Sequence, residues 1–319
     1  MSNVRIRTVV LGVVAALTTL ALAASSASAL PEFGQCFVQA KHEGKYANSV
    51  CTAKAKVVET KNTGEFEWRK ATEMSAANKK LTGIGGKVGL TFLERVCEPS
   101  GNVRAAKCAT GEEEVTVGPI PPNHFVECSS ESNQGEITGP NVLKNIQVTF
   151  TGCLGPFGKC KTTGAAEGEV RLNGLKGKIG YVNKVAVPRQ AGLVLEPALA
   201  KGKVLTMICG ANAFGVAIGM GNETEGCVYP QKACGGDGVV SAITPVNTMT
   251  TELTQTFAVN EATAENVPSK LEGTQPLKEL EGFAFSPNPE FPGTSMWSKI
   301  AESLTNSDTA PEALEIKAN

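Results

Sequence analysis

A glutamate next to a tryptophan, Glu67–Trp68, is the pair in this chain that could most directly do chemistry on a sugar. Glycoside hydrolysis needs two carboxyl groups that flank the scissile bond, and an exposed indole can stack on a sugar ring. The triple glutamate Glu112–Glu114 supplies the candidate second carboxyl group. Two other interpretations compete with this one: Trp68 is a core residue of the N-terminal part, which we favour, and the triple glutamate is a solvated turn after Gly111. Glu67 and Trp68 are our candidates for a ligand-binding site.

No further catalytic arrangement is visible in the sequence. After residue 29 the chain has two histidines, His42 and His124, and neither has neighbours that identify it as a general base. There is no G-x-S-x-G nucleophile elbow, no H-E-x-x-H zinc motif and no phosphate-binding P-loop. We therefore expect no catalytic residue, no metal and no cofactor, and we favour a protein that is not an enzyme.

The overall charge argues against one large class of partner. Among 319 residues the chain has 30 lysines and arginines against 31 aspartates and glutamates, so its net charge is −1. Nucleic-acid binding depends on a positively charged face and on aromatic rings that stack on bases. Because aromatic residues are only 5% of the chain, we expect no nucleic-acid partner.

Residues 1–29 have the pattern of a secretory signal peptide. Arg5 and Arg7 precede the uncharged apolar stretch 8–24, and Ala27-Ser28-Ala29 places small residues before a cleavage site at Leu30. An uncleaved membrane anchor is the alternative, but the serine-rich end of the stretch is poor filler for hydrocarbon. The sequence therefore predicts a secreted protein of the extracellular space or cell envelope, with no membrane partner after cleavage.

All ten cysteines follow the predicted cleavage site, and an even number in an oxidising compartment predicts disulfides. Structural zinc is the competing interpretation, but zinc sites favour cysteines with two to four residues between them, and the tight pairs here have six residues between them. Short spacing predicts the bridges Cys36–Cys51, Cys97–Cys108, Cys153–Cys160 and Cys227–Cys234, and elimination leaves Cys128–Cys209.

Alternation of apolar and polar residues, the pattern of half-buried strands, dominates the mature chain. The clearest strand covers residues 249–259, where Leu253, Gln255 and Phe257 share one face. Other candidates, separated by glycine, proline and asparagine, are 88–96, 124–128, 146–150, 169–172, 178–182, 193–195, 203–209, 239–243 and 314–317. The expected fold is all-β, an antiparallel β-sandwich or barrel stapled by disulfides, with little helix outside the signal peptide. Residues 296–304 fit both helical and strand spacing.

The chain divides by composition into four parts. After the signal peptide 1–29 we expect a small N-terminal disulfide module, 30–80, and a main β domain, 81–259, which holds most strand patterns. Residues 260–309 are rich in proline, glutamate, serine and threonine, so we expect 260–319 to be a surface-wrapping C-terminal segment that ends in an edge strand at Leu314–Ile316.

Short motifs follow one another along the mature chain: Pro31-Glu32-Phe33-Gly34-x-Cys36, Gly44-x-Tyr46, Cys51-Thr52, Gly64-x-Phe66-Glu67-Trp68, Gly135-Glu136-Ile137-Thr138-Gly139, Phe150-Thr151-Gly152-Cys153, Gly168-Glu169-Val170 and Leu314-Glu315-Ile316. Together they resemble a group of uncharacterised secreted proteins from high-GC actinobacteria. The resemblance covers most of the mature chain and implies export, but it carries no substrate or catalytic residue with it.

These observations predict a secreted, non-enzymatic cell-envelope or extracellular β protein with a structural or ligand-binding role. A cell-wall component or glycan is the partner that we expect. One alternative is a secreted carbohydrate-active hydrolase that uses two carboxylates, and another is an adhesion or inhibitor domain that presents the loop 152–161. The hydrolase differs from the others in a testable way, because its acids must converge in a concave pocket.

Overall fold

The structure is a computed structural model, described over residues 30–40, 42–98, 113–119, 126–155, 157–198, 202–210, 214–220, 238–260, 265–274, 280–285 and 296–318. The predicted signal peptide 1–29, His124 and Glu112 lie outside these ranges, as do Cys108, Cys227 and Cys234, so the expected bridges Cys97–Cys108 and Cys227–Cys234 are not among the described contacts. Within the described ranges, no helix has the length and apolar character needed to cross a membrane.

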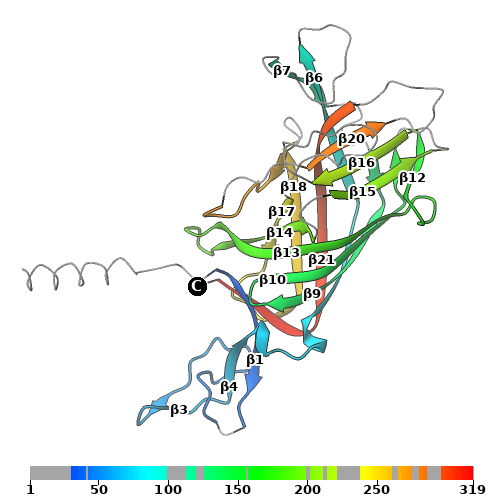
Figure 1. Cartoon of the computed structure of the whole chain (residues 1–319). Coiled ribbons are helices and arrows are strands. Elements are labelled where there is room, and N and C mark those ends of the chain that lie inside the picture. The colour runs from blue at the N-terminus through cyan, green and yellow to red at the C-terminus, as the bar shows by residue number, and fades with distance from the viewer. Residues whose placement is uncertain are drawn as a thin grey trace, which may run out of the picture. The chain divides into compact units, whose positions relative to one another are not determined.

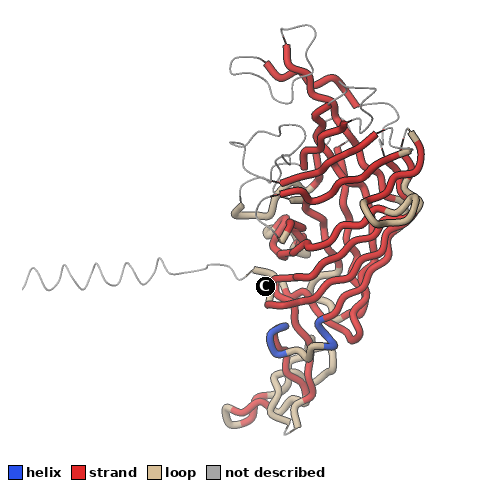
Figure 2. The backbone as a smooth tube through the Cα atoms, turned by 45° about the vertical axis from the view of Figure 1, so that its right-hand side comes forward, coloured by secondary structure: helices blue, strands red, loops and turns tan. Residues whose placement is uncertain are grey.

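Strand is the main secondary structure of the described chain. Figure 2 shows helix only in two short turns, which are the 3-10 helices η1 (Ala71–Glu73) and η2 (Ala77–Lys79). The all-β prediction is therefore confirmed, and of the two architectures expected the chain adopts the barrel.

Eight antiparallel strands close into a barrel, in which each strand pairs with two neighbours. The order around this first circuit is β5–β9–β10–β13–β14–β17–β18–β21, with β21 returning to β5. Closure satisfies the backbone groups that an edge strand would leave unpaired. The bounds are β5 (Lys80–Gly85), β9 (Ser130–Gly139), β10 (Val142–Thr151), β13 (Val170–Asn183), β14 (Gln190–Pro197), β17 (Val239–Thr244), β18 (Thr250–Asn260) and β21 (Met296–Lys317).

A second closed circuit continues the first, in the order β6–β8–β11–β12–β15–β16–β20–β21. Its strands adjoin those of the first circuit along the chain: β5 leads into β6, β8 into β9 and β10 into β11. Strand β21, the long red strand of Figure 1, belongs to both circuits. The bounds are β6 (Val88–Glu98), β8 (Val126–Cys128), β11 (Leu154–Gly155), β12 (Gly158–Thr162), β15 (Gly202–Cys209), β16 (Phe214–Met220) and β20 (Leu280–Phe285). The chain thus passes up and down through one long barrel. Two further strands, β7 (Glu113–Pro119) and β19 (Glu265–Val267), pair with β6 and β18.

The N-terminal module contains β1 (Glu32–Val38), β2 (Val57–Val58), β3 (Lys61–Asn62) and β4 (Phe66–Lys70), and the barrel begins with β5 at Lys80. Strand β1 pairs with β4 of the module and with the end of β21, where Phe33 lies opposite Ile316. Both of these side chains are fully buried. Residues 31–318 form one compact unit, so this seam joins the module to the barrel.

The C-terminal segment differs from the expected surface wrap. Residues 296–317 form a single strand, β21, which pairs with β18 on one side and with β5 and β6 on the other. Leu304, Leu314 and Ile316 are buried, because β21 is the eighth strand of the barrel wall and its inward side chains pack in the core. The ambiguous stretch 296–304 is accordingly strand, and Leu314–Ile316 pairs with β18 and β1 instead of forming an edge.

Alternate side chains fill the barrel interior. On β10, Leu143, Ile146, Val148 and Phe150 are buried, whereas Gln147 is exposed. The inward spacing of three residues between Leu143 and Ile146 is possible because the ladder shifts register between them, at a bulge that holds Asn145 at φ 54°. The local sequence therefore adapts a period of two to the curvature of a closed wall.

Three disulfides lie within the described residues: Cys36–Cys51, Cys128–Cys153 and Cys160–Cys209. The first confirms the sequence prediction, but the expected bridges Cys153–Cys160 and Cys128–Cys209 are wrong. Cys160 and Cys209 are direct partners on the paired strands β12 and β15, and Cys128 ends β8 beside the β10–β11 junction that holds Cys153. Strand pairing therefore decides the bridges, and distance along the chain does not.

Candidate functional site

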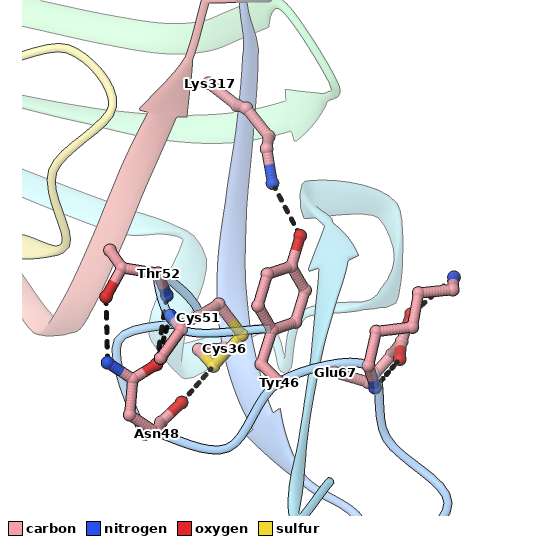
Figure 3. The surroundings of a disulfide bond; sticks show 9 residues. Cys36, Tyr46, Asn48, Cys51, Thr52, Glu67 and Lys317 are labelled. Atoms are coloured by element: carbon pink, nitrogen blue, oxygen red, sulfur yellow. Dashed lines mark hydrogen bonds and ion pairs between the residues drawn. A yellow bond between two sulfur atoms is a disulfide. The ribbon is translucent and has the colours of Figure 1, made fainter. Parts of the chain in front are cut away.

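Glu67 lies on β4 of the module and is bonded to another residue of the module. Its carboxylate accepts hydrogen bonds from the Lys45 backbone N–H at 2.9 Å and from Lys45 Nζ at 2.8 Å (Figure 3). Partial burial disfavours the charged form, but the Lys45 bonds outweigh it and hold the pKa of Glu67 below its ordinary value. A general acid of a glycosidase needs a raised pKa, so Glu67 is poorly prepared for that role.

Trp68 packs between β1 and the C-terminal strand. Gly34 lies against its ring, since a Cβ at that position would come within 2.3 Å of the indole. Lys317 Nζ lies 4.6 Å from the ring centroid of Trp68 and donates a hydrogen bond of 3.3 Å to the Tyr46 hydroxyl (Figure 3 shows the latter). The indole is half-buried and already in contact with Gly34 and Lys317. Its candidate partners Glu112–Glu114 lie outside the residues whose side chains are described.

A second group of polar side chains, which the sequence did not single out, lies in the first circuit of the barrel, four of them buried and the fifth, Asn133, half-buried. Glu131 and Asn133 come from β9, Gln255 from β18, and Asn306 and Asp308 from β21. We call these five residues the acid–amide cluster. Glu131, Asp308, Asn306 and Gln255 are each at most 7% exposed, which is unusual for charged and amide side chains.

Two glycines of β5 make room for this cluster. Asp308, Gly83 and Asn133 lie in one row across β21, β5 and β9, and Asn306, Gly85 and Glu131 lie in the next inward row. A Cβ at Gly83 would meet the Asp308 carboxylate at 2.1 Å, and one at Gly85 would meet the Glu131 carboxylate at 2.7 Å. Because β5 has no side chains at these two positions, residues two strands apart reach each other across it.

Asp308 is well supplied with donors. Asn133 Nδ2 donates to one carboxylate oxygen at 2.9 Å, and Gln255 Nε2 donates to the other. The hydroxyl of Ser241, which is fully buried, approaches the Gln255 carbonyl oxygen at 3.4 Å. Burial raises the pKa of Asp308 above its ordinary value, although both amide bonds favour the ionised form.

Glu131 is the opposite case. The residue is 3% exposed, and neither carboxylate oxygen has a hydrogen-bond partner within normal limits. Burial, together with the nearby Asp308 charge, raises the pKa of Glu131 to about 7, although the Asn133 and Asn306 amides act in the opposite direction and lower it. The Asn306 carbonyl oxygen is also buried without a partner. These three unpaired oxygens flank Gly85.

The cluster forms one wall of a cavity in the barrel. The positions open to the centre of a water molecule fill about 90 Å³, which is room for several waters or for part of a small ligand. Most of the remaining lining is hydrocarbon: Leu81, Leu143, Ile146, Val148, Phe150, Leu172, Leu175, Leu193, Leu195, Pro197, Val239, Phe257 and Leu304. A mainly apolar cavity with a few convergent polar groups is the usual form of a small-molecule site.

In the described part of the chain, no three His, Cys, Asp or Glu side chains come close enough together to hold a metal ion.

The sequence signal that could have revealed the acid–amide cluster is the presence of polar residues on the inward face of a strand. Gln255 shares a face with Leu253 and Phe257, and Asn306 and Asp308 alternate from Leu304 towards Ala310. Polar residues at positions where the strand pattern calls for apolar ones indicate a special site, and here these residues meet in one interior cluster.

No protein-family model, curated protein or solved structure matches this chain. The interpretation of the cavity therefore depends on its geometry and chemistry.

Proposed function

We propose that the chain is an exported, non-enzymatic β-barrel protein of the extracellular space or cell envelope that binds a small, mainly apolar molecule inside the barrel. The cavity of about 90 Å³ carries this proposal. Thirteen of its lining residues are apolar, so a hydrocarbon ligand would leave water for an environment that matches it. A cell-wall glycan, the partner expected from the sequence, suits the cavity less well because its hydroxyls need many hydrogen-bond partners.

Export is supported by two independent features. Residues 1–29 have the signal-peptide pattern, and the three bridges Cys36–Cys51, Cys128–Cys153 and Cys160–Cys209 are of a kind that persists in oxidising compartments. We accordingly group the chain with the secreted actinobacterial proteins that its motifs resemble. A secreted barrel with an internal cavity suits the carriage or capture of a poorly soluble molecule.

Calorimetric titration of the secreted protein with n-octanol tests the proposal. We expect saturable binding that Val148→Phe weakens by at least about tenfold, because Val148 lines the cavity and a larger side chain there fills it. The matched control is Gln147→Phe, since Gln147 is the exposed neighbour on the same strand. Equal affinity of both variants for octanol, or no binding by the unmodified protein, would refute an internal apolar site.

A two-carboxylate hydrolase is the second candidate function. One observation favours Glu131 and Asp308 as its carboxyl groups over Glu67 and Glu112–Glu114, the pair expected from the sequence. Glu131 and Asp308 line the same cavity, and both have pKa values above the ordinary range, whereas Glu67 has a lowered pKa. Parallel assays on cell-wall and plant polysaccharides decide between the candidates. Turnover that disappears in Glu131→Gln would establish the hydrolase, and the absence of turnover with retained octanol binding supports the carrier.

A further inference from the structure

The acid–amide cluster is incomplete in its hydrogen bonding. Within it Asp308 receives a donor at each oxygen, from Asn133 and Gln255. The two oxygens of Glu131 and the carbonyl oxygen of Asn306 receive none within normal hydrogen-bond limits, although the Asn133 and Asn306 amides lie close enough to Glu131 to lower its pKa. A buried carboxylate or amide oxygen without a partner costs about 1 to 3 kcal/mol, and more when it is charged, so native proteins rarely keep three of them together. A ligand that donates hydrogen bonds would complete the set.

We propose that Glu131 and Asn306 bind the ammonium group of a primary amine whose hydrocarbon part fills the apolar cavity. This inference rests on the proposed ligand-binding function and specifies the class of ligand: a cationic amphiphile. The Glu131 carboxylate supplies the opposite charge, and Asn306 on the other side of Gly85 supplies a further acceptor.

The number of acceptors selects this chemistry. An ammonium group has three N–H donors, and the cavity wall has three buried oxygens without a donor. Hydrogen bonds between an ammonium and a carboxylate are charge-assisted and about twice as strong as neutral ones. A calcium ion needs six to eight oxygen ligands, so three free oxygens would leave it undercoordinated. A ligand carboxylate would place a third acid beside Glu131 and Asp308, and neighbouring like charges repel one another.

The surroundings of Glu131 also determine how amine binding should depend on pH. The groups that face it are Asn133 on its own strand, Gly85 on β5, Phe150 on β10, and Asn306 and Asp308 on β21. Only Asp308 among them titrates. Because the pKa of Glu131 is about 7 in the empty site, the carboxylate is available to the cation above that pH and is neutralised below it.

A matched set of n-alkyl probes tests the inference: octylamine, octanol and octanoate, titrated into the full-length secreted protein at about pH 8. We expect octylamine to bind at least about tenfold more tightly than octanol, and octanoate to bind most weakly. Octylamine affinity should fall as the pH is lowered through about 7, and octanol affinity should stay constant.

Glu131→Gln has the same shape without the charge, so it should weaken octylamine binding much more than octanol binding and thereby abolish the preference for octylamine. The control is Glu127→Gln, an exposed acid on β8, which should keep the preference. Asn306→Leu, which removes the third acceptor, gives a second variant and should reduce the preference while leaving octanol binding in place. Circular dichroism of each variant checks that the barrel is folded.

The outcomes separate this inference from the proposed function. Equal affinities for octylamine and octanol, or tightest binding of octanoate, overturn the ammonium site and leave the apolar carrier standing. Binding of calcium alone that Glu131→Gln removes overturns it in favour of a metal site. If none of the alkyl probes binds across a series from hexyl to dodecyl, the proposed function itself fails.

Discussion

Glu131 stands out at the scale of single residues because its neighbours do not satisfy it. Asp308, which lies in the adjacent inward row, has two amide donors, while Glu131 has none within normal hydrogen-bond limits. The two acids share one apolar cavity, yet their environments separate their chemistry. Such a difference between neighbouring carboxyl groups is a mark of binding and catalytic sites.

The raised pKa of Glu131 predicts how stability depends on pH. In the unfolded chain the carboxyl titrates near its ordinary value of 4.5, and in the folded chain near 7. The folded state therefore binds more protons between these values, and the free energy of unfolding falls as the pH rises from about 4.5 to about 7, by roughly 3 kcal/mol. Urea denaturation at a series of pH values measures this slope.

Glu131→Gln mimics the neutral carboxyl group, so it should flatten the pH profile and make the protein more stable than the unmodified chain above pH 7. A smaller slope at lower pH should persist, because burial also raises the pKa values of Asp308 and Glu315. An unchanged profile in this variant would show that Glu131 is not buried in the way described here.

At the scale of elements, β5 works through the side chains that it lacks. Gly83 and Gly85 let β9 and β21 share one polar cluster across the strand between them. These glycines cost the strand little packing, because side chains of the neighbouring strands occupy the space beside Gly83 and Gly85.

Gly83→Ala should therefore destabilise the barrel by about 1 to 3 kcal/mol, because its Cβ would displace both Asp308 and Asn133. Gly86→Ala is the matched control, since a Cβ there meets nothing within 4 Å. Urea denaturation measures both. Equal stability of the two variants would mean that the cluster is looser than its packing indicates.

The bridges are the second device at this scale. Cys160–Cys209 joins β12 to β15 over a sequence separation of 49 residues, whereas Cys36–Cys51 spans 15 within the module. Because a longer closed loop restricts the unfolded chain more, Cys160→Ala/Cys209→Ala should cost about 4 kcal/mol and Cys36→Ala/Cys51→Ala about 3 kcal/mol. Thermal unfolding of both variants shows which bridge contributes more to stability.

Peptide mapping under non-reducing conditions should recover Cys128 linked to Cys153. A peptide linking Cys153 to Cys160 would contradict the barrel register.

At the scale of the whole molecule, the module and the barrel share a core. Strand β1 is bonded to both β4 and β21, and Phe33 and Ile316 are buried at the seam. Gln35 crosses the same seam, where its side chain donates to the Ala313 carbonyl oxygen at 3.1 Å. We therefore expect the module and barrel to unfold together.

Urea unfolding followed by tryptophan fluorescence and by far-UV circular dichroism should give coincident transitions. Phe33→Ala should shift both by about 3 to 5 kcal/mol, because it empties the shared core. Val38→Ala, at the exposed end of the same strand, should shift neither by more than about 0.5 kcal/mol. Two separate transitions would show that the module is an independent domain.

Local pattern was sufficient for the class of fold and for most of the strands. A period of two is written into each segment, so strands such as 88–96, 203–209 and 239–243 were predictable without any knowledge of their partners. The bridge Cys36–Cys51 was predictable for the same reason, since it closes a short local loop. Glu67 and Trp68 are neighbours in sequence and so form a visible pair, but their contacts with Lys45 and Lys317 join distant parts of the chain and leave no local pattern.

Non-local pairing decided everything that requires two distant segments to meet. Cys160 finds Cys209, and Glu131 comes to lie across Gly85 from Asn306, only after eight strands close into a ring with one register. A shift of one residue in any of these pairings would turn the inward polar side chains to the outside. The composition of each strand is a local property of the chain, but the cavity and its unpaired oxygens exist only in the closed barrel, because they are made by residues whose contact depends on closure.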